Sequence, residues 1–125
     1  MNALKFSGPS LRILLGSDNH HLVSAVSSTL LKAGFHVDTA NDYNHLEVLW
    51  TRTRHDIVLF EVSRPDSIES ATESALRIKR QDARQFIAYL ADANLQMSGL
   101  TGDAIFSRNL HTLPQALRAA LGEEV

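Results

Sequence analysis

A single carboxylate stands near the end of the most apolar stretch of the chain. The sequence HDIVLFEVSRPD contains an apolar, strand-like run from Asp56 to Val62 and then enters a turn around Pro65. Glu61 lies close to the end of that run. An aspartate there would suggest an acceptor for a phosphoryl group, whereas glutamate carries its carboxylate one methylene further out. The residue type therefore suggests a position that is similar to a phosphate acceptor but is not one.

Other reactive residue types lack the spacing that their chemistry needs. With no cysteine in the chain, we expect no disulfide, thiolate metal site or thiol nucleophile. His20 and His21 are adjacent, and adjacent helix residues point about 100° apart, so they are poorly placed to share one metal ion. Gly16 and Gly34 stand alone, so there is no glycine-rich phosphate loop, and no Gly-x-Ser-x-Gly elbow occurs. The sequence predicts no enzyme activity and no cofactor.

Length and charge suggest one domain without nucleic-acid or membrane binding. The chain has 125 residues, of which 44% are hydrophobic, and this is enough for one core. A net charge of -2 lacks the basic excess of a nucleic-acid binder. No apolar run reaches the roughly 18 residues of a membrane span, and we expect a cytoplasmic protein. Residues 1–10 are interpreted as a leader, 11–121 as the domain and 122–125 as a tail or the start of a linker.

Apolar periodicity predicts alternating strands and helices. Strands are expected at Leu11–Leu15, Phe35–Ala40, Asp56–Val62, Phe86–Ala91 and Ala104–Ser107, with Gly16 ending the first. Helices are expected at His20–Ala33, after the Asn41-Asp42 cap, at Ile68–Gln81 and at Leu113–Leu121, with an ambiguous short one at Ala93–Thr101. Such alternation favours a parallel sheet between two helical layers. Ligands of such sheets bind beyond the carboxyl ends of the strands, here at Gly16–Asn19, Glu61–Pro65, Leu90–Asp92 and Ser107–Asn109.

Four segments in this order resemble the receiver domain of two-component response regulators. They are RILLGSDN, LLKAGFHVDTAND, HDIVLFEVSRPD and GDAIFSRNL, with 43 residues from Asp18 to Glu61. The resemblance covers Leu11 to Leu121. It implies a flavodoxin-like (CheY-like) α/β fold, a three-layer sandwich with five parallel strands in the order 2-1-3-4-5 and about five helices.

The resemblance also assigns a role to each position of the site. Receivers move a phosphoryl group from a histidine kinase to an aspartate, using a magnesium ion held by that aspartate and two acidic residues. Carried over, the two acidic positions fall on Ser17 and Asp18, and the acceptor falls on Glu61. The switch hydroxyl falls on Leu90, and the switch aromatic falls on Ile105, beside Phe106. The lysine falls on Arg108, and the proline after it falls on Asn109. Of the five chemical positions, only Asp18 keeps its residue type.

These departures predict a degenerate receiver, or pseudo-receiver. Displacing the Glu61 carboxylate by more than about an ångström can alone cost about a hundredfold in rate, and a neutral Ser17 weakens the magnesium site. We therefore expect no metal site beyond weak magnesium binding at Asp18 and Glu61. The expected function is a phosphorylation-independent interaction module in bacterial two-component-type signalling, as part of a larger regulator or as a small adaptor.

Glu61 has two interpretations. In the first, its charge imitates the phosphorylated state by projecting toward Arg108, whose planar fork can hold a carboxylate with two hydrogen bonds. In the second, Glu61 is an ionised remnant that pairs with Arg108 and signals nothing. The sequence favours the second, because Leu90 removes the hydroxyl that connects acceptor and switch in the family.

A third alternative is a small-ligand or cobalamin-type binding domain. Asp18-Asn19-His20 after the first strand is similar to the way in which cobalamin-binding domains present their axial histidine. Against it, Val23 stands where that family has a glycine, and Leu90-Ala91-Asp92 replaces its later glycine-rich turn.

The resemblance also implies where partners bind. In receivers the fourth helix, fifth strand and fifth helix contact partner proteins or a second copy, which here corresponds to Ala93–Gly99, Ala104–Ser107 and Leu113–Leu121. The candidate contact residues are Leu95, Met97, Leu100, Phe106, Leu113 and Leu117.

Overall fold

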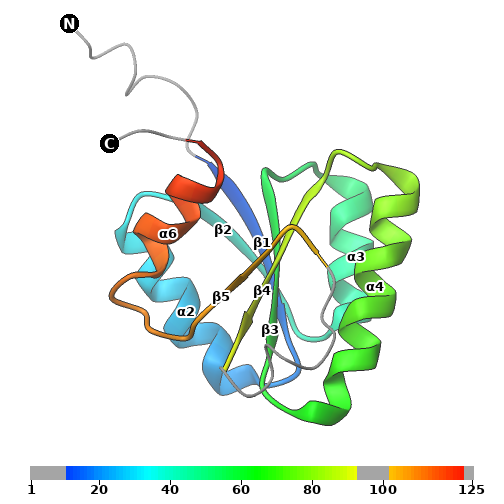
Figure 1. The fold of residues 1–125 in the computed structure, drawn as a ribbon, viewed down its shortest axis with the longest axis horizontal. Coiled ribbons are helices and arrows are strands. Elements are labelled where there is room, and N and C mark those ends of the chain that lie inside the picture. Colours follow the sequence, from blue (N-terminus) through cyan, green and yellow to red (C-terminus); the bar gives the residue numbers. More distant parts are fainter. Residues whose placement is uncertain (1–10, 93–101, 123–125) are drawn as a thin grey trace, which may run out of the picture.

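A five-stranded parallel sheet lies between two layers of helices (Figure 1). The computed structural model describes residues 11–92 and 102–122. The strands are β1 (Arg12–Ser17), β2 (His36–Ala40), β3 (Ile57–Val62), β4 (Phe86–Ala91) and β5 (Ala104–Phe106), in the order β2-β1-β3-β4-β5. This confirms the predicted fold class and strand order. The expected helix at 93–101 lies outside the described residues.

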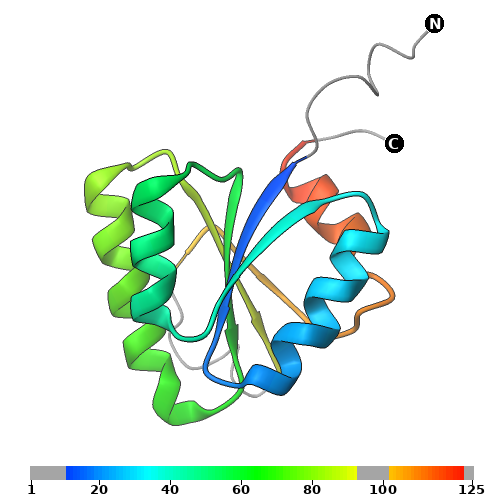
Figure 2. The ribbon, with the colours of Figure 1, turned by 180° about the vertical axis from the view of Figure 1, so that it is seen from behind.

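Four α-helices in the described ranges cover the two faces of the sheet. α2 (His20–Lys32) and α6 (Leu113–Ala120) lie on one face, and α3 (Tyr43–Arg52) and α4 (Ile68–Gln81) lie on the other (Figures 1 and 2). Asn19 caps α2 by accepting a hydrogen bond from the His21 amide at 3.0 Å, and Asp42 caps α3 in the same way from His45 at 2.7 Å. A short 3₁₀ helix, Pro65–Ser67, leads into α4.

The core has two halves, one on each face of the sheet. In β1, Ile13 and Leu15 face the α2 and α6 layer, and Leu14 faces the α3 and α4 layer, and all three are fully buried. Strands buried on both faces read as continuous apolar runs, which is why β1 and β3 could be predicted from sequence.

The first strand does not end at Gly16 as predicted. β1 continues to Ser17, because Ser17 pairs with Glu61 in the β1–β3 register. A glycine fits inside this strand because Leu46 of α3 occupies the space above it, and a β-carbon on Gly16 would lie 2.5 Å from Leu46 Cδ1. Glycine thus lets α3 pack closely on β1 within the strand, which continues to the edge where Glu61 stands.

The amino end of the sheet is held by a buried polar chain. Trp50 of α3 is 2% exposed, and its indole Nε1 donates to Gln85 Oε1 at 2.8 Å. Gln85 Nε2 in turn donates to the His55 carbonyl at 3.1 Å. Trp50 is therefore a core residue. Within the described part of the chain, no helix is long and apolar enough to cross a membrane.

We expect Gly16→Ala to destabilise the fold by about 1–3 kcal/mol, the usual cost of overpacking a filled core. Urea unfolding followed by Trp50 fluorescence measures this cost. The double variant Gly16→Ala/Leu46→Ala provides the control, because shortening Leu46 vacates the space that the new methyl group needs. Its cost should be smaller than the sum of the two single costs. Additive costs would show that Leu46 does not restrict this position.

Candidate functional site

The side chains at the carboxyl ends of β1 and β3 form one buried polar cluster. The parallel register places Ser17 beside Glu61, and neither residue has any exposed surface. Ser17 Oγ donates to Glu61 Oε1 at 2.5 Å, and Ser63 Oγ lies 3.0 Å from the same oxygen. The serine that replaces an acidic residue at the first family position therefore serves as a hydrogen-bond donor to the acceptor position.

The second carboxylate oxygen of Glu61 is held by Arg108, which follows β5. Arg108 Nη2 forms an ion pair with Glu61 Oε2, and Ser63 Oγ lies 3.1 Å from that oxygen. Arg108 is 21% exposed, and its Nη1 also lies 3.4 Å from Asp92 Oδ2 at the end of β4. The contact expected between Glu61 and Arg108 is thus formed, and both oxygens of the buried carboxylate have partners inside the chain.

Burial and pairing act in opposite directions on the proton of Glu61. Loss of hydration disfavours the charged carboxylate and is the largest effect, while the hydrogen bond from Ser17 and the charge of Arg108 favour it. The net result is a pKa of Glu61 raised above the ordinary glutamate value of 4.5. The charge of this side chain therefore depends on the ring of donors around it.

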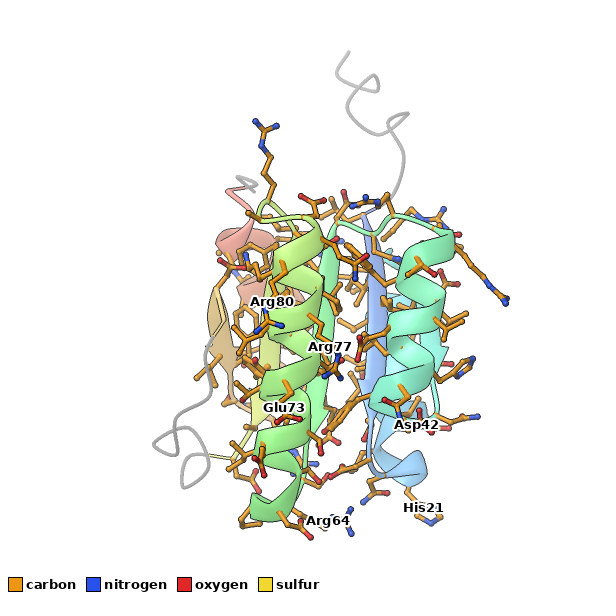
Figure 3. The ribbon with its side chains drawn as sticks, turned by 90° about the vertical axis from the view of Figure 1, so that its right-hand side faces the viewer. His21, Asp42, Arg64, Glu73, Arg77 and Arg80 are labelled. Carbon is orange, nitrogen blue, oxygen red and sulfur yellow. The ribbon has the colours of Figure 1, made fainter. Side chains whose placement is uncertain are left out.

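Asp18, the one acidic residue retained from the family pattern, has its own partners. Its Oδ2 accepts a hydrogen bond from Ser67 and lies 3.5 Å from Arg64 Nε, while its Oδ1 is buried without a partner. Arg64 projects at the carboxyl end of the sheet, below α4 (Figure 3). The sequence did not predict the contacts of Ser67 and Arg64, because they depend on how the turn after β3 folds back over β1.

These residues fit a divalent cation poorly. A magnesium ion needs several oxygen ligands with negative charge. Here Ser17 is neutral, and Glu61 and Asp18 are each already paired with an arginine. Among the described residues, no group of three or more acidic, histidine or cysteine side chains could hold a metal ion.

Tyr43 adds a further contact that the sequence did not single out. This residue opens α3, and its hydroxyl donates to the Glu61 carbonyl oxygen at 2.9 Å. Burial, with the charges of Asp18 and Glu61 nearby, raises the pKa of Tyr43, so the hydroxyl stays protonated and able to donate. The backbone of Glu61 is therefore fixed as well as its side chain.

The two predicted switch positions lie on opposite faces of the sheet. Leu90 is 1% exposed and belongs to the core half under α2 and α6, together with the half-buried Phe106, which pairs with it across β4 and β5. Ile105 packs against the other half and pairs with Tyr89. The structure thus brings Leu90 next to Phe106 and not next to Ile105.

Part of the predicted contact surface is wrong. Leu113 and Leu117 of α6 are 1% and 0% exposed, because the apolar stripe of this helix packs on the sheet, so they cannot serve as contact residues. Phe106 also packs against the core. Leu95, Met97 and Leu100 lie outside the described residues.

Several solved structures that are similar to this chain are response regulators or receiver domains. No protein-family model and no curated protein sequence matches the chain. Among solved structures, the chemotaxis protein CheY4 of Vibrio cholerae is 21% identical with a TM-score of 0.75, over 90% of this chain and 99% of that one. The response regulator TrrA of Thermotoga maritima, in complex with Mg²⁺ and BeF, is 18% identical with a TM-score of 0.76, over 88% and 98%.

A CheY-like receiver domain from Methanospirillum hungatei gives a TM-score of 0.75 at 16% identity, covering 91% of this chain and 95% of that chain. At these identities the likeness shows the fold. The chain has the fold of response regulator receiver domains, and the cobalamin-type alternative gains no support from these comparisons.

We expect Glu61→Gln to change how stability depends on pH. The folded chain binds the Glu61 proton more tightly than the unfolded chain does, so this group favours folding below about pH 4.5. That contribution is lost as the pH rises through the folded pKa. The free energy of unfolding of the unsubstituted protein should therefore fall relative to that of Glu61→Gln as the pH rises from 4 to 8. Urea unfolding at a series of pH values measures the difference.

Glu69→Gln, at an exposed position of α4, is the matched control for the loss of one negative charge. A difference that instead grows in favour of the unsubstituted protein with rising pH would mean that pairing with Arg108 outweighs the loss of hydration.

Proposed function

We propose that this chain is a receiver-like regulatory module of bacterial two-component-type signalling that works through protein contacts and transfers no phosphoryl group. One observation carries the proposal. The residue in the acceptor position, Glu61, has no exposed surface and is closed off by Arg108, Ser17 and Ser63 from within the chain. The module is accordingly not an enzyme.

Neither oxygen of the Glu61 carboxylate is accessible as a nucleophile. A carboxylate that accepts a phosphoryl group must present one oxygen to the incoming phosphorus atom with an accurate approach. In this chain Oε1 accepts from Ser17 and Oε2 is paired with Arg108. Attack by either oxygen would first break a hydrogen bond or ion pair that offsets the cost of burying the charge.

The site also offers little positive charge to an incoming phosphoryl group. A phosphoryl group carries several negatively charged oxygens, which receivers neutralise with a divalent ion. Here Arg108 already neutralises Glu61, and Arg64 lies beside Asp18. The arginines that could stabilise a phosphoryl group are therefore engaged by the carboxylates of the chain itself.

We do not propose that Glu61 imitates a phosphorylated state. The contact with Arg108 is common to that interpretation and to a silent ion pair, so it favours neither. Leu90 supports the silent ion pair, because its side chain is buried in the core and offers no hydroxyl to carry a signal from Glu61 toward β5.

The module would contact a protein partner or a second copy and would work in the cytoplasm. The family analogy places the contact on residues 93–99, β5 with Ser107, and the solvent side of the last helix, where Leu95, Met97 and Leu100 remain the candidate apolar contacts. Because the apolar stripe of α6 is buried, the contribution of this helix would come from its exposed polar side.

The test is an amide NMR titration with magnesium, followed by magnesium with beryllofluoride. We expect no saturable shifts at Ser17, Asp18, Glu61 or Arg108 up to millimolar concentrations, and no phosphoryl adduct by mass spectrometry after incubation with acetyl phosphate. The variant Ser17→Asp/Glu61→Asp is the matched comparison, because it restores two acidic side chains of the correct length. This variant should show localised magnesium shifts.

Saturable shifts confined to this cluster in the unsubstituted protein, or formation of the adduct, would refute the proposal. They would show that the acidic cluster still binds a metal ion and a phosphoryl mimic.

A further inference from the structure

Within residues 11–92 and 102–122, no element covers one edge of the sheet. β2 is the outermost strand, and Figure 2 shows it facing the viewer with α3 on one side and α2 on the other. The His36 amide donates to the Leu11 carbonyl at 2.9 Å, so the backbone of His36 points toward β1. Strand alternation then directs the amides and carbonyls of Val37 and Thr39 away from the sheet. β2 therefore presents unpaired backbone groups to another strand.

The charges on β2 favour one way of pairing with a copy of itself. His36 and Asp38 lie on the α3 side of the strand, half-exposed, with His36 Nε2 3.5 Å from Asp38 Oδ1. In an antiparallel pair centred on Val37, the His36 of each copy stands opposite the Asp38 of the other. An antiparallel pair centred on Asp38 would place two carboxylates opposite each other, which is destabilising.

The side chain of Asp38 is held in position for such a contact. Its Oδ2 lies 2.8 Å from Nε2 of His55, whose side chain is only 1% exposed. Partial burial acts to raise the pKa of Asp38, but the hydrogen bond with His55 and the nearby His36 and Arg12 outweigh it, so the pKa is lowered. Asp38 thus stays ionised and fixed on the α3 side, where a second copy would present its His36.

Apolar surface lies on both sides of the same edge. Leu31 of α2 is 53% exposed and lines a hollow of about 370 Å³ that reaches Thr39. On the α3 side, a second hollow of about 390 Å³ is lined by Asp38, Thr39 and Leu49 among others. The same helix carries Val48, which is 47% exposed. Two of the three large hydrophobic side chains exposed in the described residues therefore stand on the helices beside β2, and the third is Leu76.

We propose that β2 is a self-association edge, at which two copies of this chain pair their β2 strands antiparallel about Val37 and join their sheets into one. The two copies use the same surface, as a two-fold interface requires. Val37 of each copy exchanges two backbone hydrogen bonds with Val37 of the other, and two His36–Asp38 pairs flank them. This inference rests on the sheet edge and not on the proposed function, and it concerns a different surface from residues 93–99 and 104–121.

The absence of cysteine makes a cross-linking test direct. Val37→Cys places two thiols opposite each other, with α-carbons about 5.5 Å apart, within reach of a disulfide. Thr39→Cys is the matched control on the same side of the strand. In the proposed register its two thiols are separated by four residues, about 14 Å. Under mild oxidation, Val37→Cys should form a covalent dimer on non-reducing gels and Thr39→Cys should not.

If both variants cross-link equally, the proposed register is wrong. If neither variant cross-links, the β2 strands do not pair.

A second test changes the charge of the edge and needs no cysteine. His36→Glu would place carboxylates opposite Asp38 at two points, whereas His36→Gln removes the histidine without adding charge. Light scattering across a dilution series should show a species of twice 13.8 kDa for the unsubstituted chain. We expect its dissociation constant to rise at least tenfold for His36→Glu and less for His36→Gln. Circular dichroism shows whether each variant is folded. A monomer at every concentration of the unsubstituted chain, or a dimer that His36→Glu leaves intact, would refute the proposal.

Discussion

Burial of the Glu61 carboxylate is the constraint on which this end of the fold depends. A carboxylate without exposed surface costs several kcal/mol in lost hydration unless charge and hydrogen bonds replace the water. The replacements come from separate parts of the chain, with Ser17 at the end of β1, Ser63 just after β3 and Arg108 beyond β5. Removing one of them would leave a poorly compensated charge in the core. The loops at the carboxyl end of the sheet are therefore fixed to one another through a single side chain, at the place where a receiver needs an open pocket.

Some features of this arrangement could be predicted from sequence because they depend on local pattern. The apolar runs identify β1, β3 and β4 as strands, and Gly34, where φ is +98°, marks the end of the first helix. Strands that alternate with helices imply a parallel sheet. The ends of the elements depend on tertiary contacts. Gly16 looks like the end of a strand by propensity, yet it lies inside β1 under Leu46, and the strand continues to Ser17 through its pairing with β3. Those two further residues bring Ser17 to Glu61, so this contact could not be read from the sequence alone.

The last helix illustrates a second limit. Leu113 and Leu117, four residues apart, mark one apolar stripe on α6, but a stripe does not tell whether it faces the sheet or a partner. The family analogy suggested a partner, and the structure places both side chains in the core. The domain needs α6 to cover the β4 side of the sheet, and the helix has no second stripe among its eight residues. Burial within the chain therefore accounts for all of its strongly apolar surface.

The amino end of the sheet is held by hydrogen bonds of neutral groups and by contacts to Asp38. Gln85 connects the indole of Trp50 to the backbone of His55, and the imidazole of His55 holds Asp38 on β2. An edge strand whose charged side chain is fixed from the core differs from a frayed edge. The positions of the charged side chains along β2 are fixed, so an approaching strand always encounters the same arrangement of charges. Charged side chains on edge strands usually prevent indiscriminate pairing, and on β2 the order of His36 and Asp38 also selects the one register in which two identical edges are complementary.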